Sequence, residues 1–149
     1  MASETIALAS DHAGYDLKSV IIRKLKATEF EILDFGTHSN ESVDYSDYAY
    51  PLTKSIIQHV VSRGILICGS GIGMSIAANR FPQIRAALIQ DPLSAKLCRQ
   101  HNNANIICLG ARTIEIEVAL DCLKVFLETE FQGGRHTDRV KKLCNPPNS

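Results

Sequence analysis

The chain has 149 residues, 45% of them hydrophobic and 21% charged, which is enough for one domain with a sizeable core. Its 16 lysines and arginines balance its 16 aspartates and glutamates, so the formal net charge is zero. Nucleic-acid-binding and membrane-surface proteins favour a basic excess, and this composition fits neither class. No apolar run approaches the roughly 20 residues of a membrane span, and Met1 to Thr5 does not resemble a signal peptide. We therefore expect a cytoplasmic protein without nucleic-acid or membrane partners.

The first half of the chain alternates apolar runs with helical patterns. Strands are predicted over Thr5–Ser10, Phe30–Asp34 and Ile65–Cys68. The first two strands are joined by a helix whose apolar positions recur at helical spacing, at Leu17, Val20, Ile21 and Leu25. We expect a polar loop over Gly36–Asp47. The next helix is predicted to begin at Pro51 and run on to Arg63, with an inner face formed by Leu52, Ile56 and Val60.

The second half continues this alternation. Strands are predicted over Arg85–Ile89 and Asn105–Leu109. The helix between them is expected to begin at Asp91-Pro92 and end near His101, with Leu93 and Leu97 on its inner face. The C-terminal part is predicted to hold a long helix from near Thr113 to Phe131, a stop at Gly133-Gly134, a short helix over Arg135–Val140 and a frayed tail over about 144–149.

Five strands alternating with helices predict one α/β domain over residues 1–149, a three-layer α/β/α Rossmann-like fold around a five-stranded parallel sheet. In such a sheet, ligands bind beyond the carboxyl ends of the strands. The residues expected at that edge are polar or reactive: Asp11 and His12, Asp44 and Tyr45, Cys68 with the glycines after it, Asp91, and Arg112.

A glycine-rich loop directly follows the third predicted strand, in the order Cys68-Gly69-Ser70-Gly71-Ile72-Gly73. Such a loop lets backbone N–H groups converge on an anion at the start of a helix. Cys68 stands against these donors, where a thiol loses its proton more readily than usual. Considered alone, a cysteine at the end of a central strand is more often a small buried hydrophobic residue than a catalytic one.

The five cysteines and five histidines do not form a metal-binding or disulfide pattern. The cysteines are odd in number and no two are close in sequence, unlike a disulfide framework or a zinc site. The histidines include no H-x-x-x-H pair. We expect neither a metal nor a cofactor, and we interpret the four cysteines other than Cys68 as structural.

The glycine loop suggests three kinds of site. A dinucleotide-binding module would use Asp91 as its ribose-binding acid, but G-S-G-I-G is not the G-x-G-x-x-G pattern. A P-loop is excluded because no lysine follows the glycines. An acid–base enzyme would use Cys68 as base, the loop N–H groups to stabilise an enediolate, and arginines to hold a substrate phosphate. The third interpretation, an aldose–ketose isomerase of sugar phosphates, uses every part of the site.

Several motifs together resemble the type B ribose-5-phosphate isomerases, in the order found in that family. They are Asp11-His12-Ala13-Gly14, Val43-Asp44-Tyr45, Cys68 to Gly73, Arg99-Gln100-His101-Asn102, Gly110-Ala111-Arg112 and Gly133 to Arg139. The similarity runs from about Ile6 to Val140. The wider family includes isomerases of allose 6-phosphate and galactose 6-phosphate on the same fold.

The resemblance implies roles for individual residues. Cys68 matches the base that moves a proton between C2 and C1, and His101 matches the residue that assists opening of the sugar ring. The anion hole corresponds to Gly69, Ser70, Gly71, Ile72 and Gly73. Phosphate contacts correspond to His12, Arg112, Arg135 and Arg139. Sugar contacts correspond to Asp11, Tyr45 and Asn102, with Asp44 and His136 as weaker candidates. Some members of the family use a glutamate just after the loop as the base, where this chain has Met74 and Ser75. Ser70 occupies a position at which the family often has threonine.

We therefore expect an enzyme that interconverts ribose 5-phosphate and ribulose 5-phosphate through an enediolate, in the pentose phosphate pathway. Two alternatives remain open: an isomerase of six-carbon sugar phosphates, and a non-catalytic module that binds a nucleotide or sugar phosphate. The discriminating residue is Cys68, because a binding module needs no thiol at the loop.

Helix geometry further predicts an active site shared between two subunits. The helix from Thr113 has about 17 residues and travels about 25 Å, so Arg135 and Arg139 should emerge at the edge opposite Cys68. His101 ends a helix that runs in the same direction. We therefore expect a homodimer, with a dimer of dimers as a further option, in which His101 or the Arg135–Arg139 pair acts on the partner's site.

Overall fold

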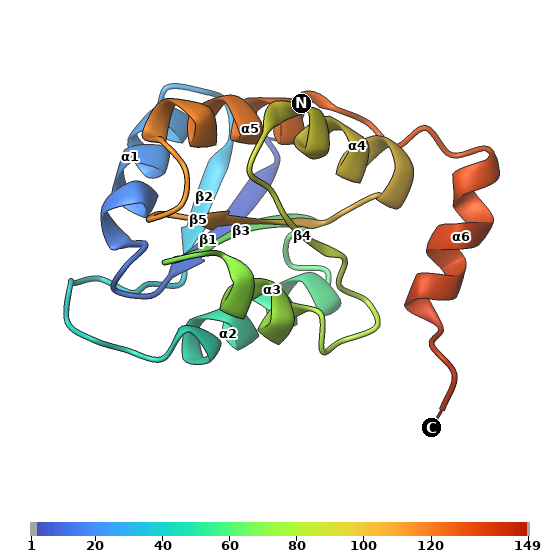
Figure 1. Cartoon of the computed structure of the whole chain (residues 1–149), viewed down its shortest axis with the longest axis horizontal. Coiled ribbons are helices and arrows are strands. Elements are labelled where there is room, and N and C mark those ends of the chain that lie inside the picture. Colours follow the sequence, from blue (N-terminus) through green and yellow to red (C-terminus); the bar gives the residue numbers. More distant parts are fainter. Residues whose placement is uncertain (1–2, 149) are drawn as a thin grey trace.

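The structure is a computed structural model that describes residues 3–148. Its centre is a five-stranded parallel sheet in the order β2-β1-β3-β5-β4 (Figure 1). The strands are β1 (Thr5–Ser10), β2 (Glu31–Asp34), β3 (Arg63–Cys68), β4 (Ala86–Leu88) and β5 (Ile106–Gly110). The helices are α1 (Tyr15–Lys26), α2 (Tyr45–Ile57), α3 (Ile72–Ala78), α4 (Pro92–Asn102), α5 (Ile116–Glu128) and α6 (Arg135–Cys144).

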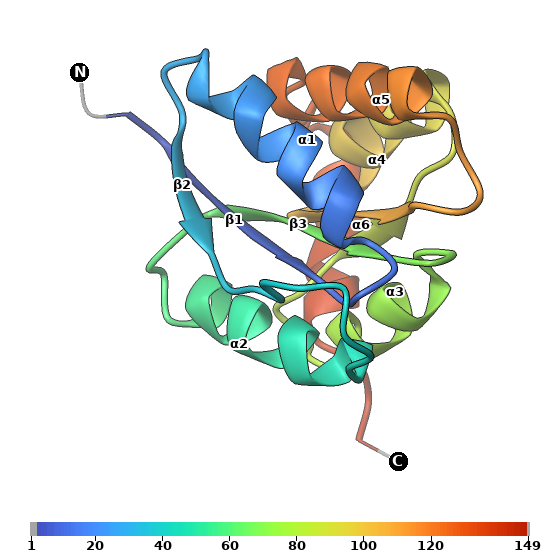
Figure 2. The same cartoon turned by 90° about the vertical axis from the view of Figure 1, so that its left-hand side faces the viewer.

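The predicted three-layer α/β/α architecture is confirmed. Helices α1, α4 and α5 cover one face of the sheet and α2 and α3 cover the other (Figure 2). Successive side chains of β3 alternate between the two cores: Ile65 and Ile67 face α1, whereas Leu66 and Cys68 face α2 and α3. All four are buried. This burial on both faces explains why the strand has an unbroken apolar sequence.

Helix α2 begins earlier than the sequence pattern indicated. Residues 45–47 were expected in a loop and Pro51 in the first turn, but the helix starts at Tyr45 and Pro51 lies inside it. Proline removes one backbone hydrogen bond there. Tertiary packing compensates for this loss, because Ala49 and Leu52 on either side of Pro51 are completely buried against the sheet.

The end of α2 was also predicted wrongly. The helix stops at Ile57, so Val60 does not extend its inner face and is 63% exposed. Arg63 belongs to β3, two residues before the predicted start of that strand. It pairs in register with Ile6 of β1, and this ladder determines the strand's first residue.

The inner face of α4 differs from the predicted one. Leu93 and Leu97 were expected to face the core, but they are 64% and 36% exposed. The buried residues are Ala95 and Cys98, because the helix approaches its neighbours closely along its small side chains. The adjoining strand β4 keeps only three residues of the predicted five and forms one edge of the sheet.

The C-terminal helices have other lengths than predicted. Helix α5 spans 13 residues and ends at Glu128, three residues before Phe131, where Thr129 takes an extended conformation. Helix α6 spans 10 residues and continues to Cys144, beyond the predicted Val140. It stands apart from the three layers, on the side of α4 and β4 (Figure 1). Residues 145–148 contain no helix or strand, and Ser149 lies outside the described residues. No helix in residues 3–148 is long and apolar enough to cross a membrane.

Candidate active site

Cys68 ends the central strand β3, and its side chain is 4% exposed. The backbone N–H of Gly71 donates a hydrogen bond to Cys68 Sγ over 3.2 Å. Strand β5 holds the loop in place, since the N–H groups of Ala111 and Arg112 donate to the carbonyl oxygens of Cys68 and Gly69, both over 2.9 Å. The thiol and the glycine loop therefore form one rigid unit in the middle of the carboxyl edge.

Gly71 allows this loop to pack against β5. Its φ is +77°, in the left-handed region that favours glycine. A Cβ atom on Gly71 would lie 2.7 Å from Leu88 Cδ1 and 3.0 Å from the carbonyl carbon of Leu109. A side chain at this position would push the loop away from the sheet and move the Gly71 N–H away from the thiol.

The start of α3 faces the start of α2. A Cβ atom on Gly73 would lie 2.7 Å from the ring of Tyr45, so this ring lies directly against the helix start. Tyr45 is 43% exposed and its ring can meet a ligand. Ser70 Oγ accepts the N–H of Ile72 over 3.2 Å, which fixes the last turn of the loop.

Asp11 and His12 follow β1, next to β3. The N–H of Asp11 donates to the Ile67 carbonyl over 3.1 Å, and Asp11 Oδ1 accepts the N–H of Gly14 over 3.1 Å. His12 Nδ1 accepts the N–H of Val43 over 3.1 Å, so the proton of a neutral His12 is on Nε2. This nitrogen is then a donor for an anion.

Arg112 completes the polar groups at this edge. Its Nη1 atom lies 3.4 Å from the position that a Cβ on Gly69 would take, so the guanidinium group covers the first glycine of the loop. The side chain is exposed. The structure thus brings together Cys68, the loop, Tyr45, Arg112 and the Asp11–His12 pair.

The other predicted site residues lie elsewhere. His101 and Asn102 end α4, and the next residue, Asn103, shares a cavity with Arg63, the first residue of β3. The C-terminal end of α4 is therefore at the amino edge of the sheet, opposite Cys68. Arg135 and Arg139 are exposed on α6, which adjoins this end of α4.

Asp91 does not have the role that a dinucleotide site requires. It is the N-cap of α4, where Oδ1 accepts the N–H of Ser94 over 2.8 Å and Oδ2 pairs with the Ser94 hydroxyl over 3.0 Å. These hydrogen bonds, first the one from the Ser94 backbone, lower the pKa of the Asp91 carboxyl group. Both carboxylate oxygens are used in capping the helix, which removes the main support for the dinucleotide interpretation.

Three other cysteines have a different environment from Cys68. Burial raises the pKa of Cys98 to about 11 and that of Cys122 to about 11. Cys108 is completely buried one strand away from Cys68, and its pKa is raised by burial first and by Cys68 second. These three thiols stay protonated near neutral pH, in agreement with a structural role.

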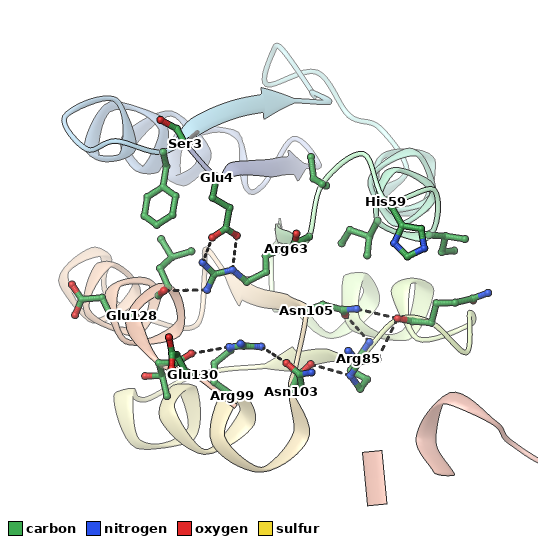
Figure 3. A pocket seen from close by; sticks show the side chains of 18 of the residues that line it. Ser3, Glu4, His59, Arg63, Arg85, Arg99, Asn103, Asn105, Glu128 and Glu130 are labelled. Atoms are coloured by element: carbon green, nitrogen blue, oxygen red, sulfur yellow. Dashed lines mark hydrogen bonds and ion pairs between the residues drawn. The ribbon is translucent and has the colours of Figure 1, made fainter. Parts of the chain in front are cut away.

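A large cavity lies at the opposite edge of the sheet, and none of the predicted site residues lines it. Its volume is about 1010 Å³, and three arginines point into it (Figure 3). Arg63 pairs with Glu4 over 2.6 and 2.8 Å, whereas Arg85 and Arg99 both donate to Asn103. Each guanidinium group therefore already has protein partners. The sequence offered no signal for this cavity, because these arginines come from β3, from the residue before β4 and from α4.

Residues 3–148 contain no group of three or more histidine, cysteine, aspartate or glutamate side chains that could hold a metal ion.

Comparisons with known proteins show which family this chain resembles over nearly its whole length. The family model described as Ribose/Galactose Isomerase matches residues 6–143. Ribose-5-phosphate isomerase B of Escherichia coli is 41% identical over 138 residues, 93% of either chain. The crystal structure of a ribose 5-phosphate isomerase from Thermotoga maritima is 48% identical with a TM-score of 0.93, covering 96% of this chain and 99% of that one. Ribose-5-phosphate isomerase B from Mycoplasma genitalium, crystallised with bound ribulose 5-phosphate, is 36% identical with a TM-score of 0.92, covering 97% and 96%.

The fold and the site define a sugar phosphate isomerase of the α/β class. The chain belongs to the ribose/galactose isomerase family, as the match over residues 6–143 and the 41% identity to the Escherichia coli protein show. The resemblance to type B ribose-5-phosphate isomerases is confirmed.

Proposed function

We propose that this enzyme interconverts ribose 5-phosphate and ribulose 5-phosphate in the cytoplasm, as a step of the pentose phosphate pathway, with Cys68 as the catalytic base. The observation that carries the proposal is the hydrogen bond of 3.2 Å from the Gly71 N–H to Cys68 Sγ. An N–H donor favours the thiolate, which is the form that accepts a proton. The bound ribulose 5-phosphate in the related Mycoplasma genitalium structure supports this choice of substrate.

The reaction requires a proton to move between two neighbouring carbons. Cys68 removes the proton from C2 of the open-chain aldose, which places the negative charge on the carbonyl oxygen at C1 of an enediolate, and then returns the proton to C1. The C1 oxygen takes up a proton as the C2 hydroxyl loses its own, so C2 becomes the carbonyl of the ketose. Backbone N–H groups of the loop over Gly69–Gly73 stabilise the charged oxygen of the enediolate, as in an oxyanion hole. Tyr45 and Asp11 hold the sugar, and the phosphate binds to His12 and Arg112, whose donors face the same edge.

The activity test uses protein dialysed against EDTA. We expect it to convert ribose 5-phosphate to a ketose at an unchanged rate, because neither the thiol nor the N–H groups need a metal. Loss of activity that one divalent ion restores would contradict this mechanism. A value of kcat/KM larger for allose 6-phosphate than for ribose 5-phosphate would favour the six-carbon alternative, and no turnover of either sugar would favour a binding module.

We further propose that two subunits form the active site together. His101, Asn102, Arg135 and Arg139 have matching residues in the family's site, yet their helices end at the edge opposite their own Cys68. A two-fold dimer would bring them to the Cys68 loop of the partner. A row of exposed apolar side chains around the edge strand β4 supports such a contact: Ile72, Ile76, Leu88 and Leu93, between 37% and 64% exposed.

Mixed dimers test the shared site. Cys68→Ala and His101→Ala, each inactive alone, are unfolded and refolded together, and Cys68→Ala is paired separately with Arg139→Ala. In a trans arrangement, a mixed dimer has one intact site and one doubly altered site, so activity returns. The control pairs Cys68→Ala with Gly71→Ala, two substitutions at the Cys68 loop. Neither site of such a mixed dimer has an intact loop, so the mixture should stay inactive. Mixed dimers that form without regaining activity in either pair would contradict the proposal.

A further inference from the structure

Two histidines from different helices form a stacked pair. The ring of His101, at the end of α4, lies on the ring of His136, in the first turn of α6, with centroids 4.3 Å apart and planes at 13°. His136 is 7% exposed. Neither imidazole takes part in a hydrogen bond among residues 3–148, so the stack is the main contact that defines the orientation of these rings.

The backbone around this pair is held in place independently of the rings. The Gln132 N–H donates to the Gln100 carbonyl over 3.1 Å, and Arg99 Nε donates to the Thr129 carbonyl over 3.0 Å. The His136 N–H donates to the Gly133 carbonyl over 3.0 Å. The connection between α5 and α6 is therefore joined to the last turn of α4, and it presents His136 to His101.

We propose that His136 is a positioning residue that holds the His101 imidazole in the orientation needed to open the substrate's sugar ring. The proposal rests on the proposed function of His101 as the group that assists ring opening. A stacked ring restricts rotation of its neighbour without using either of that neighbour's nitrogens. Both nitrogens of His101 then remain available for proton transfer, which a positioning hydrogen bond would not allow.

The electrostatics of the pair fit this role. Burial, followed by the positive charges of His101, Arg135 and Arg139, lowers the pKa of His136. These are the charged groups that act on it from α4 and from α6 itself. His136 is therefore neutral near pH 7 and offers a flat uncharged surface. A protonated His136 would repel a protonated His101, the form that has to give a proton.

Ring opening itself leaves the proton count unchanged. Protonated His101 gives a proton to the ring oxygen as the bond between C1 and that oxygen breaks, and C4 gains a hydroxyl group. The C1 hydroxyl loses its proton to water, which returns one to His101, and C1 becomes an aldehyde. Orientation matters here because a displacement of about 1 Å can lower a rate roughly 100-fold.

The test separates ring opening from the chemistry at Cys68. Ribulose 5-phosphate cannot close to a furanose, since its C5 oxygen carries the phosphate, so exchange of its C1 hydrogen with deuterium oxide needs the base but no ring opening. We compare His136→Ala, His136→Leu and His136→Phe with the wild type, both in turnover of ribose 5-phosphate and in this exchange. Circular dichroism and thermal unfolding report the folding of each variant.

We expect the alanine and leucine variants to lose roughly 10- to 100-fold in turnover and to keep exchange within about threefold. The phenylalanine variant can still stack and should keep turnover within about threefold of the wild type. If His136→Ala does not fold, the comparison of leucine with phenylalanine, both apolar, decides the question.

Three outcomes would overturn the proposal. Equal losses of turnover and exchange would mean that His136 has a general structural role. Full turnover in His136→Leu would mean that His136 has no role in ring opening. Equal defects in the leucine and phenylalanine variants would exclude stacking as the cause. Failure of the proposed function looks different: the wild type would show no exchange at C1, or Cys68→Ala would retain it.

Discussion

The two edges of the sheet are built from different groups. At the carboxyl edge, backbone groups dominate: the Gly71 N–H meets Cys68 Sγ, and β5 holds the loop through main-chain hydrogen bonds. At the amino edge, long side chains dominate, and Arg63, Arg85 and Arg99 tie carbonyl oxygens together around a cavity of about 1010 Å³. The large cavity is at the second edge, whereas Cys68 and its glycine loop are at the first.

In this structure the large cavity and the proposed catalytic thiol lie at opposite edges of the sheet. Cys68 and the Gly71 N–H lie at the carboxyl edge, while His101 and the α6 arginines lie at the other edge. Substitutions at Cys68 and its loop should therefore affect the rate, and substitutions of the arginines that line the cavity should affect mainly stability.

The largest effect is expected for Cys68→Ala. Removal of a catalytic base lowers the rate by about 10²- to 10⁴-fold, so turnover of ribose 5-phosphate should fall at least that far while substrate binding changes only a few fold. Cys108→Ala is the matched control, since this thiol is on the adjacent strand and completely buried. It should keep activity within a few fold and lose about 1–2 kcal/mol of stability. Near-normal turnover by Cys68→Ala would exclude the thiol as base.

Gly71→Ala comes next. The left-handed φ costs alanine about 1–2 kcal/mol, and the contacts with Leu88 and Leu109 add roughly 1–3 kcal/mol. We expect a lower midpoint of urea unfolding together with a large loss of kcat, because the N–H moves away from Cys68. Gly133→Ala is the control: its φ is +68°, but the nearest atom, Thr137 Oγ1, is 3.6 Å away. Similar losses of kcat in the two variants would contradict the importance of the loop's packing.

Arg99→Ala tests the amino edge. This guanidinium group donates to the carbonyl oxygens of Thr129 and Ala104 and to Asn103 Oδ1. Its loss leaves these half-buried acceptors without a partner, and we expect about 2–4 kcal/mol of destabilisation, measured by urea unfolding. The exposed Arg80 serves as control, and Arg80→Ala should change stability by at most about 0.5 kcal/mol. A loss of kcat as large as that of Cys68→Ala, in a folded protein, would erase the contrast between the edges.

The smallest effect concerns acid stability. Because burial lowers the pKa of His136 below its usual value of 6.5, the unfolded chain binds more protons than the folded one as the pH falls below about 6.5. Stability is therefore lost as the pH drops through the folded-state pKa of His136. His136→Phe should show a smaller decrease in its urea midpoint between pH 7.5 and pH 5 than the wild type. His38→Phe, at an exposed position, should behave like the wild type; an identical decrease in all three proteins would refute this contribution.

The strands and the loop could be predicted closely, because their signals are local. β1 has the predicted bounds, and β3 ends at the predicted Cys68, since an apolar run followed by glycines specifies a buried strand and a tight loop without reference to distant residues. The motif order from Asp11 to Arg139 was likewise sufficient to recognise the family.

The start of α2 and the buried face of α4 are determined by tertiary contacts. Pro51 is typical of a first turn, yet the burial of Ala49 and Leu52 holds it inside the helix. Leu93 and Leu97 have the spacing of an inner face, but the closer approach through Ala95 and Cys98 determines which side is buried. Hydrophobic periodicity indicates that a helix has an apolar stripe, whereas the partners that bury it are chosen by the packing of the whole chain.

The sequence by itself determined the fold class, the thiol at the glycine loop and the family. Only the tertiary structure showed that α4 ends at the arginine-lined edge, that Arg99 joins α4 to the segment before α6, and that His136 lies on His101. The reason is physical: a strand–loop–helix unit is specified by residues adjacent in the chain, while the stacked histidines are 35 positions apart, as their numbers 101 and 136 show, and meet only through the packing of two helices.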